Sequence, residues 1–144
     1  MKKHTIYLLV IITFLMVSCN SKKVSEQQEF LSGYWVIESV TMPDGSTKKF
    51  GPTTSIDFVE ITGDSGIRKK LMPKLDGTYR KFVGSEQFFL ETKDDSLYLH
   101  YKTPYANWTE VVIEANAETL VLKNKGNRAY KYTRHEPINL FEDE

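Results

Sequence analysis

The sequence predicts an all-β protein, a small antiparallel up-and-down β-barrel of eight to ten strands preceded by a short helical turn. From Gly33 onward, turn signals such as Pro43-Asp44-Gly45 and Asp76-Gly77 recur about every ten residues. The segments between them are rich in Val, Ile, Thr, Tyr and Phe, the residue types that favour strands. Several segments also alternate between apolar and polar residues, as strands with one buried face do. A meander of this length removes its free edges best by closing into a barrel.

Composition limits the classes of function. The chain has 144 residues, the size of one domain, and is 40% hydrophobic and 26% charged, an ordinary globular mixture. Its 19 basic and 19 acidic residues cancel, which argues against a general nucleic-acid binder because such proteins need a basic excess. A single cysteine excludes an intrachain disulfide and a zinc site built from several cysteines.

Residues 1–18 have the pattern of a lipoprotein signal peptide. A basic start is followed by an apolar run, Ile6 to Val17, which is shorter than the ~20 residues that span a bilayer as a helix. The stretch from Leu15 to Cys19 resembles the bacterial lipoprotein box. The resemblance implies that Cys19 carries palmitate-type acyl chains and anchors the protein in a bacterial cell envelope, where we expect the outer membrane. The alternatives are an ordinary secretory signal and a short membrane anchor.

A tether and a helical turn are expected between the signal and the barrel. Residues 20–24 are mostly polar and are interpreted as a flexible tether. Ser25 followed by Gln28 fits a capping box, which predicts one helical turn over 26–31. The expected organisation is therefore a lipidated tether and turn over 19–31, a barrel over 32–135 and an acidic tail over 136–144. The apolar residues Ile138, Leu140 and Phe141 are expected to dock that tail on the barrel.

The strands are predicted from the spacing of the turns, over 33–42, 46–50, 54–62, 67–74, 78–83, 86–92, 97–103, 108–114, 119–123 and 127–134. Alternation predicts which side chains share a face. The predicted sets are Leu97, Leu99 and Tyr101; Trp108, Glu110, Val112 and Glu114; and Tyr130, Tyr132 and Arg134. An eight-stranded barrel either is filled by such side chains or holds one small ligand.

The start of the first strand, Gly33-Tyr34-Trp35, resembles the Gly-x-Trp motif of the lipocalin superfamily. The layout of residues 31–135 is similar to that of the small lipocalin-like lipoproteins of Bacteroidetes-type bacteria. The resemblance implies that Trp35 closes one end of the barrel and that a basic residue near the last strand packs over its ring. Arg134 matches that basic residue best and Arg128 is the second choice. Gly33, Trp35 and Arg134 are thus expected to have structural roles.

An aromatic cluster is the candidate ligand site. Aromatic residues make up 12% of the chain. Six of these aromatic residues, together with Phe88, are expected to line an apolar cup with polar tips, which suits a hydrophobic ligand with one polar end. The alternative is that these rings only fill the barrel. The candidate ligand-binding residues are Tyr79, Phe89, Tyr98, Tyr101, Tyr105 and Trp108.

The sequence predicts no catalytic residue, metal or cofactor. No Gly-x-Ser-x-Gly motif occurs, and His100 and His135 have no metal-ligand spacing with a carboxylate such as Glu136. An enzyme would require His100 beside a carboxylate in a cleft. The stretch Arg68-Lys69-Lys70, with Lys74 beyond it, is interpreted as a solvated strand face, and contact with an anionic surface is the alternative.

One short motif concerns modification. Asp95-Ser96-Leu97 resembles the site at which Bacteroidetes-type bacteria O-glycosylate exported proteins, so Ser96 is a candidate glycosylation site.

Two functions remain open beside the less favoured enzyme. The first is binding of a small hydrophobic or amphipathic ligand by a lipid-anchored envelope protein. The second is a protein-interaction or inhibitor module with a filled barrel. A cavity of ~300 Å³ or more favours the first, since ligand sites usually start near that volume. A packed interior with an exposed apolar patch favours the second.

Overall fold

The computed structural model describes residues 23–82 and 84–136, and the structural statements below concern these residues. They form ten strands, in close agreement with the predicted ranges. The strands are β1 (Gly33–Thr41), β2 (Thr47–Lys49), β3 (Ile56–Thr62), β4 (Ser65–Pro73), β5 (Tyr79–Lys81), β6 (Glu86–Lys93), β7 (Ser96–Lys102), β8 (Asn107–Ala115), β9 (Thr119–Asn124) and β10 (Ala129–Arg134).

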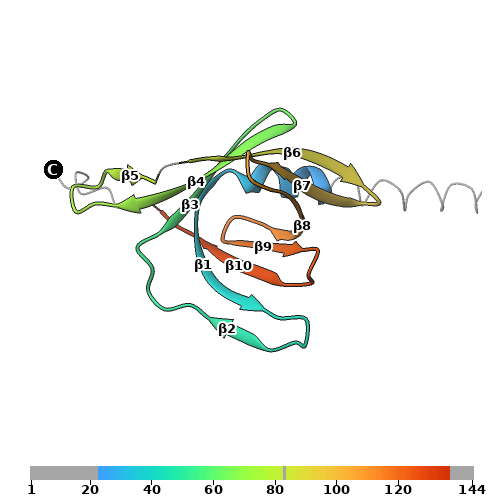
Figure 1. Ribbon diagram of the computed structural model, residues 1–144, viewed down its shortest axis with the longest axis horizontal. Helices are drawn as coiled ribbons and strands as arrows, with labels where there is room; N and C mark the ends of the chain where they lie inside the picture. The colour runs from blue at the N-terminus through green and yellow to red at the C-terminus, as the bar shows by residue number, and fades with distance from the viewer. Residues whose placement is uncertain (1–22, 83, 137–144) are drawn as a thin grey trace, which may run out of the picture.

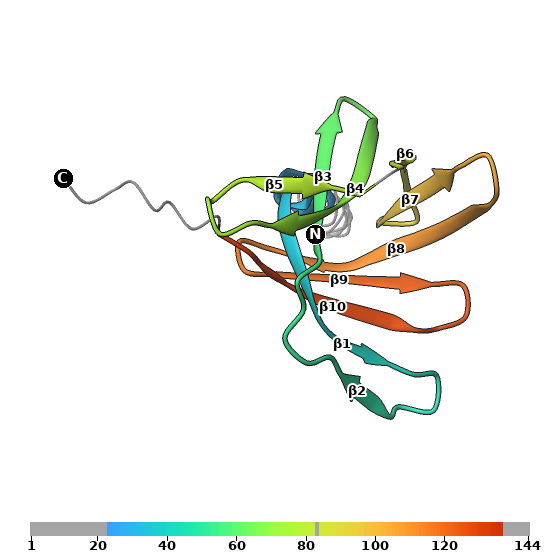
Figure 2. The ribbon, with the colours of Figure 1, turned by 60° about the vertical axis from the view of Figure 1, so that its left-hand side comes forward.

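Eight of these strands close into an antiparallel barrel. The order around the ring is β1-β3-β4-β6-β7-β8-β9-β10, and β10 pairs back with β1. β8, β9, β10 and β1 lie side by side in one wall (Figure 2). β2 pairs with the end of β1 and β5 with the end of β4, so both extend the barrel as outlying hairpins (Figure 1). The predicted all-β antiparallel barrel is therefore confirmed.

Two β-bulges interrupt the regular alternation. One lies in β1 between Ile37 and Ser39, opposite β10, and the other in β8 between Val112 and Glu114, opposite β9. The second bulge corrects the prediction that Glu114 shares a face with Trp108, Glu110 and Val112. Because the extra residue shifts the pleat, Ala115 is buried in the core and Glu114 is exposed.

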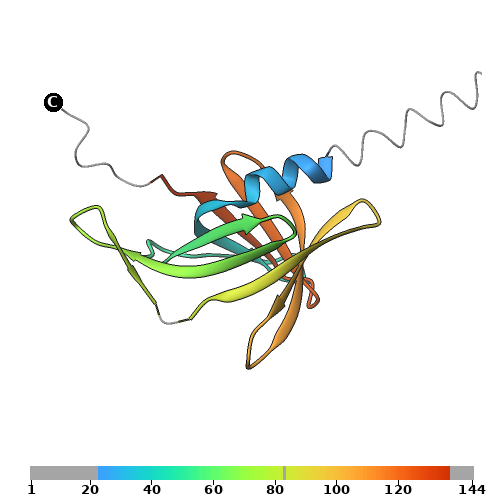
Figure 3. The same cartoon turned by 90° about the horizontal axis from the view of Figure 1, so that it is seen from above.

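A helix over residues 23–31 covers one end of the barrel (Figure 3). Val24 and Leu31 bury their side chains in the core at 4% and 1% exposure. The amide of Gln27, on the same helical face, donates to the Ile113 carbonyl at 3.4 Å. The predicted helical turn is thus present but longer than expected, and the tether interpretation is wrong for Lys23 and Val24. No described helix has the length and apolar character needed to span a membrane.

The two ends of the barrel differ in their connections. The closed end carries the helix and the β3–β4, β6–β7 and β8–β9 turns, whereas the open end carries the β1–β2, β4–β5, β7–β8 and β9–β10 turns. The core toward the closed end is mostly apolar. Its buried members include Val24, Leu31, Trp35, Val59, Phe88, Leu97, Leu99, Val112, Ala115, Leu120 and Leu122.

The predicted signal peptide, Cys19 and the tail from residue 137 onward lie outside the described residues.

Candidate functional site

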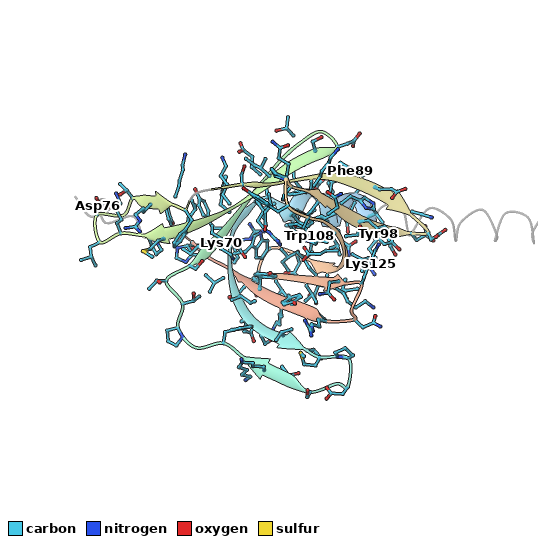
Figure 4. The ribbon with its side chains drawn as sticks, in the orientation of Figure 1. Lys70, Asp76, Phe89, Tyr98, Trp108 and Lys125 are labelled. Atoms are coloured by element: carbon cyan, nitrogen blue, oxygen red, sulfur yellow. The ribbon has the colours of Figure 1, made fainter. Side chains whose placement is uncertain are left out.

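A cavity of about 490 Å³ opens at the open end of the barrel. Its volume lies within the ~300–1,000 Å³ that is typical of small-molecule sites, so side chains fill only part of the barrel. Figure 4 labels Trp108 and Lys125, which contribute to its lining from β8 and from the β9–β10 turn. The lining residues are Arg68, Asn107, Trp108, Thr109, Glu110, Asn124, Lys125, Gly126, Tyr130 and Tyr132.

Aromatic rings form one part of this lining. Trp108 stacks on Tyr101 with ring centroids 4.7 Å apart and only 6° between the ring planes. The two residues are cross-strand partners, and both lie on the inner face of the barrel wall. Tyr130 and Tyr132, two residues apart on β10, also line the cavity. The cavity therefore offers flat apolar faces to a bound molecule.

Charged side chains form the deeper part of the lining. The guanidinium of Arg68 is 4.6 Å from the ring centroid of Tyr101, a cation–π contact. Arg68 Nε donates to Glu86 Oε2 at 2.6 Å, and Nη1 donates to Glu110 Oε2 at 3.3 Å. The side chains of Arg68 and Glu110 are only 14% and 9% exposed. Two carboxylates thus compensate one buried guanidinium, which these partners hold in place.

This arrangement corrects the interpretation of the basic stretch on β4. Strand alternation places Arg68 and Lys70 on the inner face and Lys69 on the outer face. Lys70 pairs with Asp57 of β3, with 2.6 Å between Nζ and Oδ1. Arg68 is therefore ion-paired within the barrel and does not belong to a solvated strand face, whereas the Lys70 side chain stays 62% exposed despite its pairing with Asp57.

Burial sets the protonation of this cluster. It raises the pKa of Glu110, although Arg68 opposes the shift. Burial also raises the pKa of Tyr101 and Tyr132 well above the ordinary tyrosine value. The Tyr101 hydroxyl is buried near the Glu110 carboxylate, which contributes to its raised pKa, but the two groups do not reach the geometry of a full hydrogen bond. Such a polar atom is normally satisfied by a water molecule or a ligand.

The six aromatic residues predicted to bind a ligand do not line one cup. Tyr101 and Trp108 lie inside the barrel, but Phe89 and Tyr98 (Figure 4) lie on its outer wall, where the ring of each is stacked near that of His100. The ring centroids of Phe89 and His100 are 4.6 Å apart, and Phe89 is 51% exposed. The two sets separate because neighbouring residues of a strand point to opposite faces.

The other two predicted aromatics lie still farther from the cup. Tyr105 is 97% exposed in the β7–β8 connection. Tyr79 of β5 stacks on Tyr34 of β1 with centroids 5.3 Å apart, and Tyr34 in turn contacts Phe58. Ligand binding by Tyr101 and Trp108 stays a prediction.

Sequence reasoning missed four residues of the site: Arg68, Glu110, Tyr130 and Tyr132. For the last three, the predicted alternation already placed each on the same face as a core residue. What it lacked was the closure of β10 onto β1, which brings the two tyrosines into the barrel. For Arg68 the signal was weaker. Arg68 is two residues from Gly66 on β4 and therefore shares its inward face, where Gly66 lies against Phe88.

The closed end is tied together by Trp35 and Arg134. Trp35 is 1% exposed, and its indole N–H donates to the Leu31 carbonyl at 2.9 Å. The Arg134 guanidinium lies over the Trp35 indole, 4.0 Å from the ring centroid. Gly33 has φ +133°, and a Cβ at this position would collide with the Arg134 guanidinium. Arg134 also donates hydrogen bonds to the carbonyls of Phe30, Ser32 and Ala117. Arg128, the second choice from the sequence, is exposed on the β9–β10 turn.

His100 lies on the outer wall in a groove of about 540 Å³. Its Nε2 is 2.7 Å from Glu91 Oε2, and its Nδ1 is 3.0 Å from Thr109 Oγ1. A histidine beside a carboxylate is what an enzyme would require. However, β7 and β8 are each paired on both sides, so the strand ladders occupy their backbone N–H groups, which are then not free to stabilise an oxyanion. In the described part of the chain, no group of three His, Cys, Asp or Glu residues is placed to hold a metal.

Known proteins resemble this chain in sequence pattern or in structure. A family model described as a lipocalin-like domain matches residues 31–122. The chain is similar to a solved lipocalin-like protein from Bacteroides uniformis, with 13% identity and a TM-score of 0.46, covering 73% of this chain and 98% of that one. A protein from Bacteroides eggerthii gives 13% identity and a TM-score of 0.46, with 72% and 98% covered. Apocrustacyanin C1 gives 12% identity and a TM-score of 0.46, covering 85% of this chain and 72% of that one. No curated protein matches the sequence significantly.

Proposed function

Because the chain belongs to the lipocalin-like domain family, we propose that it binds a small amphipathic molecule in the cavity at the open end of its barrel. The observation that carries the proposal is the cavity of about 490 Å³ above an apolar, filled closed end. An eight-stranded barrel of this kind has room for one small ligand. No chemical step is needed for this function.

The lining supports a ligand with both apolar and polar parts. Trp108, Tyr130 and Tyr132 offer ring faces to a hydrocarbon or aromatic portion. Arg68, Glu110 and the Asn124 amide offer donors and acceptors to polar atoms, in the same cavity. A wholly apolar ligand would leave these polar groups desolvated without new partners. The cavity also argues against the interaction-module alternative, because that alternative requires a barrel filled by side chains.

We further propose that the protein is anchored in a bacterial envelope, in the outer membrane, through lipid on Cys19. The support is the sequence pattern around Cys19, the only cysteine of the chain. The helix is present by residue 23, so only residues 20–22, or ~14 Å of extended chain from one Cα to the other, separate Cys19 from the closed end. The closed end then faces the anchoring membrane, and the cavity opens away from it.

A comparison of native and denatured mass spectra of the purified chain tests the binding function. Extra mass that leaves on denaturation identifies a carried ligand and begins to name it. Trp108→Ala should abolish this carriage because it removes part of the cavity wall. Tyr98→Ala is the matched control, since it removes an aromatic ring from the outer wall and should leave carriage intact. A bare protein that also fails to bind a panel of amphipathic probes would contradict the proposal.

A further inference from the structure

Cations surround the open end of the barrel. Four turn segments lie at this end, 42–50, 74–78, 102–107 and 123–128. They contain two acidic residues, Asp44 and Asp76, against seven cations. The cations are Lys48, Lys49, Lys74, Lys102, Lys123, Lys125 and Arg128.

Acids dominate the opposite end. The helix and three turns that form the closed end occupy residues 23–32, 60–65, 91–96 and 114–119. These segments contain two cations, Lys23 and Lys93, and nine acids, and Arg134 at the end of β10 is a third cation at this end. The nearly neutral chain is therefore an electrical dipole whose positive pole surrounds the cavity mouth. The acids are Glu26, Glu29, Glu60, Asp64, Glu91, Asp94, Asp95, Glu114 and Glu118.

Two of the cations are placed to meet a bound molecule. Lys125 (Figure 4) lines the cavity, and Arg128 follows three residues later on the same turn. Asn124 fixes this turn, since its backbone N–H donates to the Arg128 carbonyl and its side chain accepts from the Arg128 N–H, both at 3.1 Å. Both cations are exposed, and neither takes part in the ion pairs formed within residues 23–82 and 84–136.

Arg68, the cation deeper in the cavity, differs from Lys125 and Arg128 because it already has ion-pair partners. Glu86 and Glu110 already compensate Arg68. A second anion brought to the floor would lie beside these carboxylates and be repelled. A ligand anion is therefore favoured at the rim, where positive charge is uncompensated.

Resting on the proposed function, we propose that the ligand is an amphipathic anion. Its carboxylate, sulfonate or phosphate group stays at the rim beside Lys125 and Arg128, and its apolar part lies against Trp108. The positive pole draws such anions to the mouth and raises their association rate. The acidic closed end disfavours their binding elsewhere on the barrel.

Two fluorescent probes with one ring skeleton test the charge requirement. 1-Anilinonaphthalene-8-sulfonate is an anion, and N-phenyl-1-naphthylamine is its neutral counterpart. The purified chain should bind the sulfonate at least about tenfold more tightly at low salt, and the difference should shrink as salt screens the rim. Trp108→Ala should weaken the binding of both probes. Sulfonate binding that is unaffected by this variant lies outside the cavity and overturns the proposal.

Charge reversal at the rim supplies the second test. The double variant Lys125→Glu and Arg128→Glu should weaken sulfonate binding about three- to tenfold, as expected for exposed charges several ångströms from the ligand. It should leave the binding of the neutral probe unchanged. The double variant Lys23→Glu and Lys93→Glu makes the same charge change at the closed end and should affect neither probe.

The outcomes separate the two proposals. Equal binding of the two probes, or a double variant without effect on the sulfonate, overturns the anion inference while small-molecule binding stands. Failure of both probes to bind argues against the proposed function itself.

Discussion

Arg134 joins three parts of the chain that are remote in sequence. Its guanidinium donates to carbonyls of the helix end, of Ser32 and of the β8–β9 turn while it stacks on Trp35. The planar fork of arginine suits this set of partners, and the single ammonium of lysine cannot serve all three.

Arg134→Lys should therefore lower the free energy of unfolding by about 2–4 kcal/mol, through lost hydrogen bonds and lost stacking. Urea denaturation measures the change. Arg128→Lys, at an exposed turn, is the matched control and should change stability by less than about 0.5 kcal/mol. Equal stabilities of the two variants would show that Arg134 does not tie the closed end together.

Glu110 should make stability depend on pH. Burial raises the pKa of Glu110, so the folded protein holds this proton more tightly than the unfolded chain, whose carboxyl titrates near the ordinary value of 4.5. The stabilisation by the bound proton is complete below that value and is lost as the pH rises through the raised pKa. Glu110→Gln should thus gain stability relative to the wild type as the pH rises from 4.5 toward neutrality.

Thermal unfolding of both proteins over this pH range measures the difference. Loss of the charge pair with Arg68 adds an offset, so the slope of the difference against pH is the diagnostic quantity. A flat or inverted slope would refute the role assigned to Glu110.

At the scale of elements, the N-terminal helix is part of the core. Leu31 is buried among side chains of the closed end, so Leu31→Ala should leave a cavity and cost about 2–5 kcal/mol. Chemical denaturation measures this cost. Glu29→Ala, on the exposed side of the same helix, should have little effect. A helix that merely lies on the surface would show equally small effects for both variants.

Most elements could be predicted from the sequence because each has a local signal. Turn residues and alternation define all ten strands, and Ser25 with Gln28 marks a helix. The helix proved longer because Val24 is buried by tertiary packing, which no local pattern reveals. The bulge in β8, which places Ala115 and not Glu114 on the inner face, also has no local signal, since it depends on the register with β9.

The candidate site was less predictable because it depends on which face of each strand meets which partner. Trp108 and Tyr101 could be predicted as part of the site, since large aromatic side chains commonly line binding cavities. Arg68 was interpreted as solvated because adjacent cations usually are. Only the closed ring shows that Glu86 and Glu110, from two other strands, converge on it.

At the scale of the whole molecule, the proposed anchor and the charge dipole give one orientation. Cys19 lies next to the acidic closed end in sequence, so a lipid on Cys19 would be at the opposite end from the basic mouth. The mouth is then free to exchange ligand on the side away from the membrane.

Cys19→Ala should leave the barrel intact but block lipid attachment, because it removes the thiol that is acylated. Fractionation of cells after processing measures membrane association, and circular dichroism checks the fold. Continued membrane association of the processed variant would contradict the lipid anchor.

The central claim is that the open-end cavity binds a small molecule, and the two tryptophans of the chain allow a direct test. The indole N–H of Trp35 is buried at the closed end, whereas Trp108 lines the cavity. We would titrate the purified chain with 1-anilinonaphthalene-8-sulfonate and follow both indole signals by ¹H–¹⁵N NMR, assigned with a Trp35→Phe variant. The account predicts that the Trp108 signal moves and the Trp35 signal keeps its position. A saturating titration that moves neither signal, or only that of Trp35, would contradict it.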